Sequence, residues 1–87
     1  MNEKSLNNKM PLSSLRLRKD MTQQEVADIL QVHRVTVSEW ENDASNMTMK
    51  FAIKLAELYE YSMDKTYYGP KKEYWDLRRY ASEKSIS

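Results

Sequence analysis

Five side chains between residues 33 and 39 have the chemistry needed to contact base pairs. Arg34 can donate two hydrogen bonds to guanine O6 and N7, and Glu39 can accept one from cytosine N4, or form a salt bridge instead. Val35 can pack on a thymine methyl group, and the Ser38 hydroxyl can reach a base edge, a phosphate or only solvent. His33, the only histidine, can donate to guanine or phosphate, cap the following helix, or stay in solvent. These side chains suit the reading of DNA in its major groove.

The apolar spacing predicts two short helices that would position these side chains. In the second helix, at about 100° per residue, Val37 and Trp40 point to one side while the four candidates from Arg34 onward occupy the opposite arc. The first helix is expected to begin at Thr22, because a threonine N-cap and a glutamate three residues later can satisfy backbone N–H groups reciprocally. Residues 31–33 interrupt the helical spacing. They predict a three-residue turn between the helices.

These two helices resemble the phage-repressor and Cro type of helix-turn-helix, also called the xenobiotic-response-element family. The resemblance covers about Leu12 to Asp64. The family pattern has a leucine-arginine pair, a Thr/Ser-Gln helix start, an apolar residue before alanine, a valine after the turn, and an apolar residue with Trp-Glu three positions later. It is met by Leu15-Arg16, Thr22-Gln23, Val26-Ala27, Val32 and residues 37–41.

The sequence departs from this family pattern at three places in loops. Gln31 stands where a turn glycine is usual, Asn42-Asp43 replace a glycine after the second helix, and Met47 replaces a common proline. A helix often closes through a residue with positive φ, which glycine adopts freely and glutamine does not. We therefore expect the turn to shift slightly at Gln31, where the glutamine costs roughly 1 kcal/mol.

The resemblance also implies roles for residues outside the base-reading face. It implies that Arg34 occupies a base-reading position of a helix in the major groove. It further implies a structural ion pair between Arg16, in the helix before Thr22, and Glu41 at the end of the base-reading helix. Such a pair would tie the helix before Thr22 to the base-reading helix and would leave N–H groups that could reach a phosphate.

Phosphate contacts are expected on either side of the base-reading helix. The backbone N–H of Gln23 lies in the first turn of its helix, and Asn42 follows the second helix, so both can fix the register on DNA. Arg18 and Lys19 lie near the end of the helix that precedes Thr22. They could contact phosphate, or they could only stabilise the negative end of their helix dipole.

A chain of 87 residues with one glycine and two prolines predicts a single small all-α domain. We expect a compact bundle of about five short helices, in which Pro11 begins the first helix, Thr48 caps a helix to about Tyr59, and Ser62 caps a short fifth helix. Residues 1–10 are expected to form a polar N-terminal arm, 11–68 the DNA-binding domain, and 69–87 a C-terminal extension. Residues 71–84 favour a helix, although a strand at the start of this segment is an alternative.

The helix predicted over residues 48–59 has an apolar face too wide for one neighbour. Its expected core stripe contains Met49, Ala52, Ala56 and Tyr59, with further apolar residues on both flanks. The apolar arc spans roughly 220°, against about 100° for an ordinary surface helix. This face requires a second partner, either the C-terminal segment or a second copy of the chain. The apolar contact would come from the flank of Phe51 and Leu58 or from residues 74–81.

The composition argues against several other functions. The chain has no cysteine, and its single histidine has no evident metal-binding or catalytic companions, so we expect no metal, no cofactor and no enzyme activity. No apolar run is long enough to cross a membrane, and the N-terminus lacks the apolar segment of a signal peptide, so we expect a cytoplasmic protein. Residues 21–64 carry three basic and eight acidic side chains, which predicts weak binding to random DNA.

Two functions fit these observations. The first is a sequence-specific transcriptional regulator that binds a roughly palindromic operator in double-stranded DNA as a homodimer, because one helix-turn-helix reads only a few base pairs. The second is an antitoxin or accessory component that presents its acidic middle and its aromatic C-terminal segment to another protein.

Overall fold

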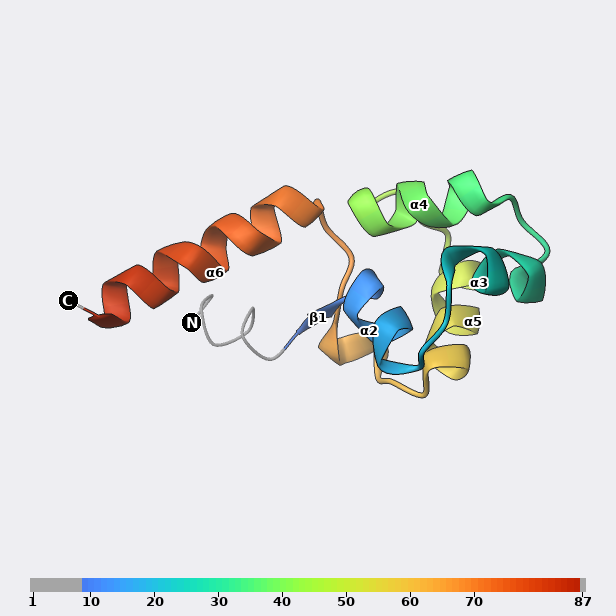
Figure 1. Cartoon of the computed structure of the whole chain (residues 1–87), viewed down its shortest axis with the longest axis horizontal. Helices are drawn as coiled ribbons and strands as arrows, with labels where there is room; N and C mark the ends of the chain where they lie inside the picture. Colours follow the sequence, from blue (N-terminus) through green and yellow to red (C-terminus); the bar gives the residue numbers. More distant parts are fainter. Residues whose placement is uncertain (1–8, 87) are drawn as a thin grey trace.

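The computed structural model describes residues 9–86, and it describes side chains from residue 9 to residue 80. In chain order, the elements are β1 (Met10–Pro11), α2 (Leu12–Arg18), α3 (Gln23–Leu30), α4 (Arg34–Asn42), α5 (Met49–Tyr59), the 3-10 helix η1 (Met63–Lys65), β2 (Thr66–Tyr67) and α6 (Lys71–Ile86). Helices α2 to α5 form one body, and α6 leaves that body and points away from it (Figure 1). The predicted all-α class is therefore confirmed.

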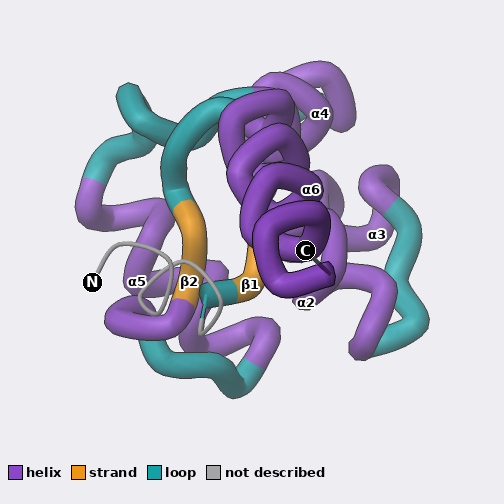
Figure 2. Tube along the Cα trace, turned by 90° about the vertical axis from the view of Figure 1, so that its left-hand side faces the viewer, coloured by secondary structure: helices purple, strands orange, loops and turns teal. Residues whose placement is uncertain are grey.

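Two short strands bring the ends of the helical body together. Strand β1 pairs in parallel with β2, with Met10 opposite Thr66 and Pro11 opposite Tyr67 (Figure 2). The predicted helical start at Pro11 is wrong by one residue, because Pro11 is the extended N-cap with ψ 157° and α2 begins at Leu12. A proline fits a strand edge, since it has no N–H to donate. Most of the predicted N-terminal arm lies outside the described residues.

The expected helix starts are met in different ways. At α3 the Thr22 side chain accepts from the Glu25 N–H at 3.1 Å, and Glu25 accepts from the Thr22 N–H at 2.8 Å, as the capping box predicts. At η1 the Ser62 hydroxyl accepts from the Asp64 N–H at 3.2 Å. At α5, Thr48 occupies the N-cap position, but its side chain makes no cap hydrogen bond within the described part of the chain. The predicted side-chain cap at Thr48 is therefore wrong.

The turn after α3 closes through Gln31 itself, without the shift that we expected. Gln31 has φ 59° and ψ 46°, which is the left-handed conformation. Its N–H donates to Asp28 O at 3.3 Å, and the Val32 N–H donates to Ala27 O at 3.0 Å. This pair of bonds is the Schellman pattern, and it satisfies carbonyls that would otherwise lack a partner at the helix end. The prediction of a shifted turn is wrong because these bonds offset the strain of a non-glycine residue.

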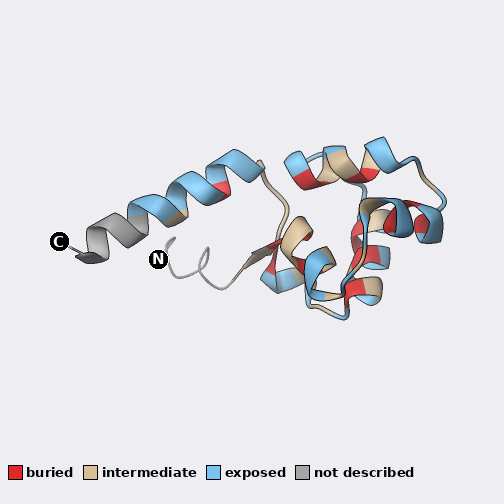
Figure 3. Cartoon of the chain, in the orientation of Figure 1, coloured by how far each residue is buried: buried red, intermediate tan, exposed pale blue. Residues whose placement is uncertain are grey.

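The core lies where α2, α3, α4 and α5 face one another (Figure 3). Its buried side chains are Leu12, Leu15, Val26, Ala27, Leu30, Val37, Ala44, Leu55 and Tyr59. The predicted core position of Met49 is wrong, because its side chain is 64% exposed. Leu55 is buried and Ala56 is only half-buried, and Met49, six residues before Leu55, lies about 120° away from Leu55 around the helix. Phe51 packs against Trp40 with ring centroids 5.0 Å apart.

Residues 71–86 form a helix, which decides between helix and strand for this segment. Its first turn is anchored by Tyr74, whose hydroxyl donates to Lys9 O at 2.8 Å and whose ring lies 5.0 Å from that of Tyr67. Tyr74 is buried, whereas Trp75 and Leu77 are exposed. Helix α6 thus docks on the helical body through Tyr74 in its first turn. Within residues 9–86, no helix has the length and apolar character needed to cross a membrane.

Candidate nucleic-acid interface

Helices α3 and α4 pack against each other and leave one face of α4 exposed. On the inner face, Val37 is buried and Trp40 is half-buried against the core. On the outer face, Arg34 and Glu39 are exposed, and Val35 is 57% exposed. Ser38, between the two faces, is half-buried. The structure therefore brings four of the predicted base-reading residues onto one short helix, with its first residue at Arg34.

His33 lies immediately before this helix as its extended N-cap residue, with φ −78° and ψ 148°. Its side chain is exposed and makes no cap hydrogen bond within residues 9–86. The cap alternative for the imidazole is therefore absent in this conformation. His33 is exposed directly before the first residue of α4.

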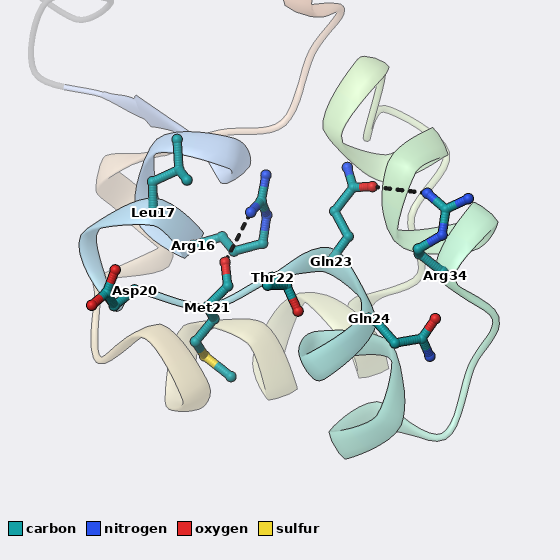
Figure 4. A pocket seen from close by; sticks show the side chains of 8 residues that line it. All are labelled: Arg16, Leu17, Asp20, Met21, Thr22, Gln23, Gln24 and Arg34. Atoms are coloured by element: carbon teal, nitrogen blue, oxygen red, sulfur yellow. Dashed lines mark hydrogen bonds between the residues drawn. The ribbon is translucent and has the colours of Figure 1, made fainter.

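A cleft of about 530 Å³ opens between the end of α2, the start of α3 and the start of α4 (Figure 4). It is lined by Arg16, Leu17, Asp20, Met21, Thr22, Gln23, Gln24 and Arg34. Gln23 and Arg34 line the same side of this cleft, and their side chains point toward each other, as Figure 4 shows. Arg34 therefore stands beside a hollow that also holds the N-terminus of α3.

Arg16 and Glu41 form an ion pair across the molecule. Arg16 Nε donates to Glu41 Oε2 at 2.7 Å, and Arg16 Nη2 donates to Glu41 Oε1 at 3.2 Å. The third nitrogen, Nη1, donates to Met21 O at 2.9 Å. The hydrogen bond to Glu41 raises the pKa of Arg16 above its ordinary value, although burial opposes this effect. The pair ties α2 to the end of α4. Each guanidinium nitrogen donates one of these bonds, which leaves one further N–H on Nη1 and one on Nη2.

The Gln23 side chain continues this network toward Arg34. Gln23 Nε2 donates to Glu41 Oε1 at 3.0 Å, and Gln23 Oε1 accepts from Arg34 Nη1 at 3.4 Å. The sequence analysis considered only the backbone of Gln23. No periodic spacing along the chain places residue 23 between residues 34 and 41, so this bridge depends on how three helices pack.

Arg18 and Lys19 lie at a different part of the molecule. Arg18 Nη2 donates to Tyr59 O at 2.9 Å, and its guanidinium lies 4.9 Å from the ring centroid of Tyr61. Lys19 Nζ lies 2.6 Å from Glu60 Oε1, and this contact lowers the pKa of the Glu60 carboxyl. Both side chains therefore contact the end of α5 and the residues that follow it, and neither lines the cleft beside Arg34.

Asn42 ends α4 and is exposed. The next residue, Asp43, accepts a hydrogen bond from the Ser45 N–H at 3.0 Å and another from the Ser45 hydroxyl. These two bonds lower the pKa of the Asp43 carboxyl. Among the described residues, no group of three or more histidine, aspartate or glutamate side chains is placed to hold a metal ion.

Comparison with known proteins identifies the family of the region that contains α3 and α4. A sequence model described as Helix-turn-helix matches residues 12–65, which include α2 to α5 and η1. The matched region is a DNA-binding regulatory domain of the Cro type and not a catalytic domain. No curated protein matches the chain. Helix α6 lies beyond the matched residues.

Proposed function

We propose that this chain, which belongs to the helix-turn-helix family of the Cro and phage-repressor type, reads a specific operator with the N-terminal half of α4. It is a DNA-binding regulator. The observation that carries the proposal is the position of Arg34, exposed at the first residue of α4 and beside the cleft. In this docking mode the start of the second helix enters the major groove.

Each exposed side chain of α4 has a distinct proposed contact. Arg34 donates two hydrogen bonds to guanine, and Val35 packs on a thymine methyl group. Glu39, one turn further along α4, accepts from cytosine N4. Ser38 is half-buried, so its hydroxyl reaches a phosphate or base edge only from the margin of this face. His33 stands at the entrance of the helix and donates to guanine or phosphate.

The phosphate contacts fall to the two ends of the helix-turn-helix. The backbone N–H of Gln23 in the first turn of α3 and the exposed Asn42 at the end of α4 can hold the backbone on either side of the groove. Arg18 and Lys19 already have partners at the end of α5, which weakens the case for them as phosphate ligands. The total phosphate neutralisation is small, so binding to random DNA is expected to be weak.

We further propose that the regulator binds as a homodimer to a palindromic operator. A single α4 reads only a few base pairs, and two copies about one DNA turn apart supply the missing area and specificity. Of the two surfaces considered for dimerisation, the flank of Phe51 and Leu58 is half-buried within the chain, by Trp40 and the core respectively. That leaves α6 as the favoured surface.

Helix α6 exposes apolar side chains that a second protein surface could cover. It contains sixteen residues, projects from the body, and exposes Trp75 at 44% and Leu77 at 49%. In proteins, most of the stability of a helix comes from packing of its apolar face against a neighbour and not from intrinsic helix propensity. A second α6 would supply a partner of equal length, because pairing about a two-fold axis can bring Leu77 of both copies together. Trp75, two residues earlier, lies about 160° away around the helix and does not share that face.

Leu77→Glu is expected to weaken dimerisation while leaving the helix-turn-helix folded, because it places a carboxylate on the exposed face of α6. Sedimentation of the free protein and gel filtration of its DNA complex measure the effect. Ile53→Glu on α5 is the matched control, since Ile53 is 45% exposed and lies outside α6. Dimers that persist in Leu77→Glu but dissociate in Ile53→Glu would place the interface on α5.

The exposed aromatic surface of α6 also favours a second candidate function, an antitoxin or accessory component that binds another protein. Aromatic residues are enriched at protein interfaces, and Trp75 lies outside the residues matched by the family. The same experiment distinguishes the two functions. A wild-type chain that stays monomeric both free and with operator DNA would favour a different protein as the partner of α6.

A further inference from the structure

The only glycine of the chain lies between β2 and α6, where the ring of Tyr67 packs on it. A Cβ atom at Gly69 would lie 2.6 Å from the Tyr67 hydroxyl oxygen and 2.8 Å from Cζ, which is too close for the ring to stay in place. The φ angle of Gly69 is not positive, so the backbone conformation itself does not require a glycine. Gly69 is therefore required by the position of the Tyr67 ring.

Two contacts hold the Tyr67 ring in this position. Its hydroxyl donates to Pro70 O at 2.9 Å, and its ring centroid lies 5.0 Å from that of Tyr74. Tyr74 is 2% exposed, and its backbone N–H donates to the same Pro70 oxygen at 3.3 Å. These contacts span the short segment between β2 and α6, so they join β2 directly to the first turn of α6.

The same segment contacts the end of the base-reading helix. Pro70 lies opposite Asp43 in an isolated antiparallel bridge, and Asp43 directly follows α4. Figure 1 shows that α6 begins beside the end of α4 and leaves the helical body there. We call Asp43, Tyr67, Gly69, Pro70 and Tyr74 the α6 junction. Its contacts fix the direction of α6 with respect to α4.

A change in this direction would move the base-reading side chains of a dimer by a distance that matters on DNA. Arg34 lies about 12 Å from the end of α4, because a helix rises about 1.5 Å per residue. A rotation of about 10° at each junction would move each Arg34 by about 2 Å and change their separation by up to about 4 Å. Neighbouring base pairs are about 3.4 Å apart, so this movement is equivalent to about one base pair.

We propose that the α6 junction sets the spacing that the regulator accepts between the two half-sites of its operator. This proposal rests on the proposed homodimer through α6. A rigid junction presents the two α4 helices at one separation, whereas an added base pair moves the second half-site and turns it by roughly 35° around the DNA. Four of the five junction residues lie beyond residue 65, so most of this constraint comes from outside the matched helix-turn-helix.

The test is Gly69→Ala, whose binding is measured on duplexes with the two selected half-sites at the operator spacing and at one base pair more or fewer. The wild type is expected to lose at least about tenfold in affinity when the spacing changes, because its second α4 no longer meets its bases. In Gly69→Ala the added methyl group displaces the Tyr67 ring and loosens the junction. The ratio of affinities between the spacings is then expected to fall by roughly threefold or more, because a looser connection spans several distances.

Tyr67→Ala provides an independent variant, because it removes the ring for which Gly69 makes room. It is expected to lower the same ratio, and the addition of Gly69→Ala to it is expected to change the ratio no further. Tyr67→Phe loses only the bond to Pro70, so it provides a milder test should the other variants fold poorly. Glu73→Ala is the matched control, since Glu73 is exposed in the first turn of α6 and lies outside the junction. It is expected to keep the wild-type ratio.

All variants are expected to sediment as dimers and to bind a duplex with one half-site as the wild type does. A monomeric Gly69→Ala would place the junction in the dimer interface and overturn the proposal. A wild-type ratio in both Gly69→Ala and Tyr67→Ala, or an equal loss of affinity for one and two half-sites, would also overturn it. If the wild type itself prefers certain bases but is indifferent to the spacing, the proposed homodimer fails first and this proposal fails with it.

Discussion

Glu41→Ala is expected to lower the free energy of unfolding by about 3 kcal/mol, the low end of the cost of breaking a buried ion pair. The substitution leaves the Arg16 guanidinium, whose side chain is only 13% exposed, without its carboxylate. It also removes the acceptor for Gln23 Nε2. Arg16 keeps its bond to Met21 O and its access to the cleft, which limits the loss. Urea unfolding followed by circular dichroism, at one fixed protein concentration, measures the change.

A double-mutant cycle with Arg16→Ala separates the pair from its surroundings. Residues in direct contact couple by about 0.5 to 3 kcal/mol, so the double variant is expected to be clearly more stable than the sum of the two single losses predicts. Glu39→Ala is the control, because it removes an exposed carboxylate from the same helix and is expected to change stability by less than about 0.5 kcal/mol. A coupling energy of zero would mean that the ion pair does not contribute to folding.

Arg34→Ala is expected to weaken specific DNA binding by about 1 to 3 kcal/mol, because the substitution removes a bidentate contact to a base. Binding to random DNA and the free energy of unfolding are expected to change little, since Arg34 is exposed and its hydrogen bond to Gln23 is long. Fluorescence anisotropy with operator and scrambled duplexes, at several salt concentrations, measures both affinities.

Lys54→Ala provides the charge-matched control for Arg34→Ala. Lys54 lies on α5 and does not line the cleft. Its loss is expected to leave the ratio of operator to random binding unchanged. An equal loss of affinity on both duplexes in Arg34→Ala would identify Arg34 as a phosphate contact and would remove the central base-reading assignment.

The parts of the fold that sequence could predict are those governed by local rules. The capping box at Thr22 needs only residues three positions apart, and the buried side of α4 follows from the spacing of Val37 and Trp40. Helix α5 was harder, because apolar residues surround most of it. Its buried face is decided by its neighbours, which is why the exposure of Met49 could not be predicted from spacing.

The candidate site could be predicted from sequence only in part, for a similar reason. The exposed position of Arg34 follows from helical periodicity and from the family resemblance. The bridge from Glu41 through Gln23 to Arg34 joins residues up to 18 positions apart and depends on packing. At Gln31 the position of the turn was predictable from the sequence. Its left-handed conformation was not, because that conformation depends on backbone hydrogen bonds and not on the residue type alone.

Selection of bound sequences from a random pool of duplex DNA, carried out in parallel with wild-type protein and Arg34→Ala, would show whether α4 reads a specific operator through Arg34. We expect the wild type to enrich two inverted half-sites about one helical turn apart, each containing a guanine whose enrichment disappears with Arg34→Ala. Two results would contradict base reading by Arg34: a pool in which the wild type enriches no sequence, or a guanine that both proteins enrich equally.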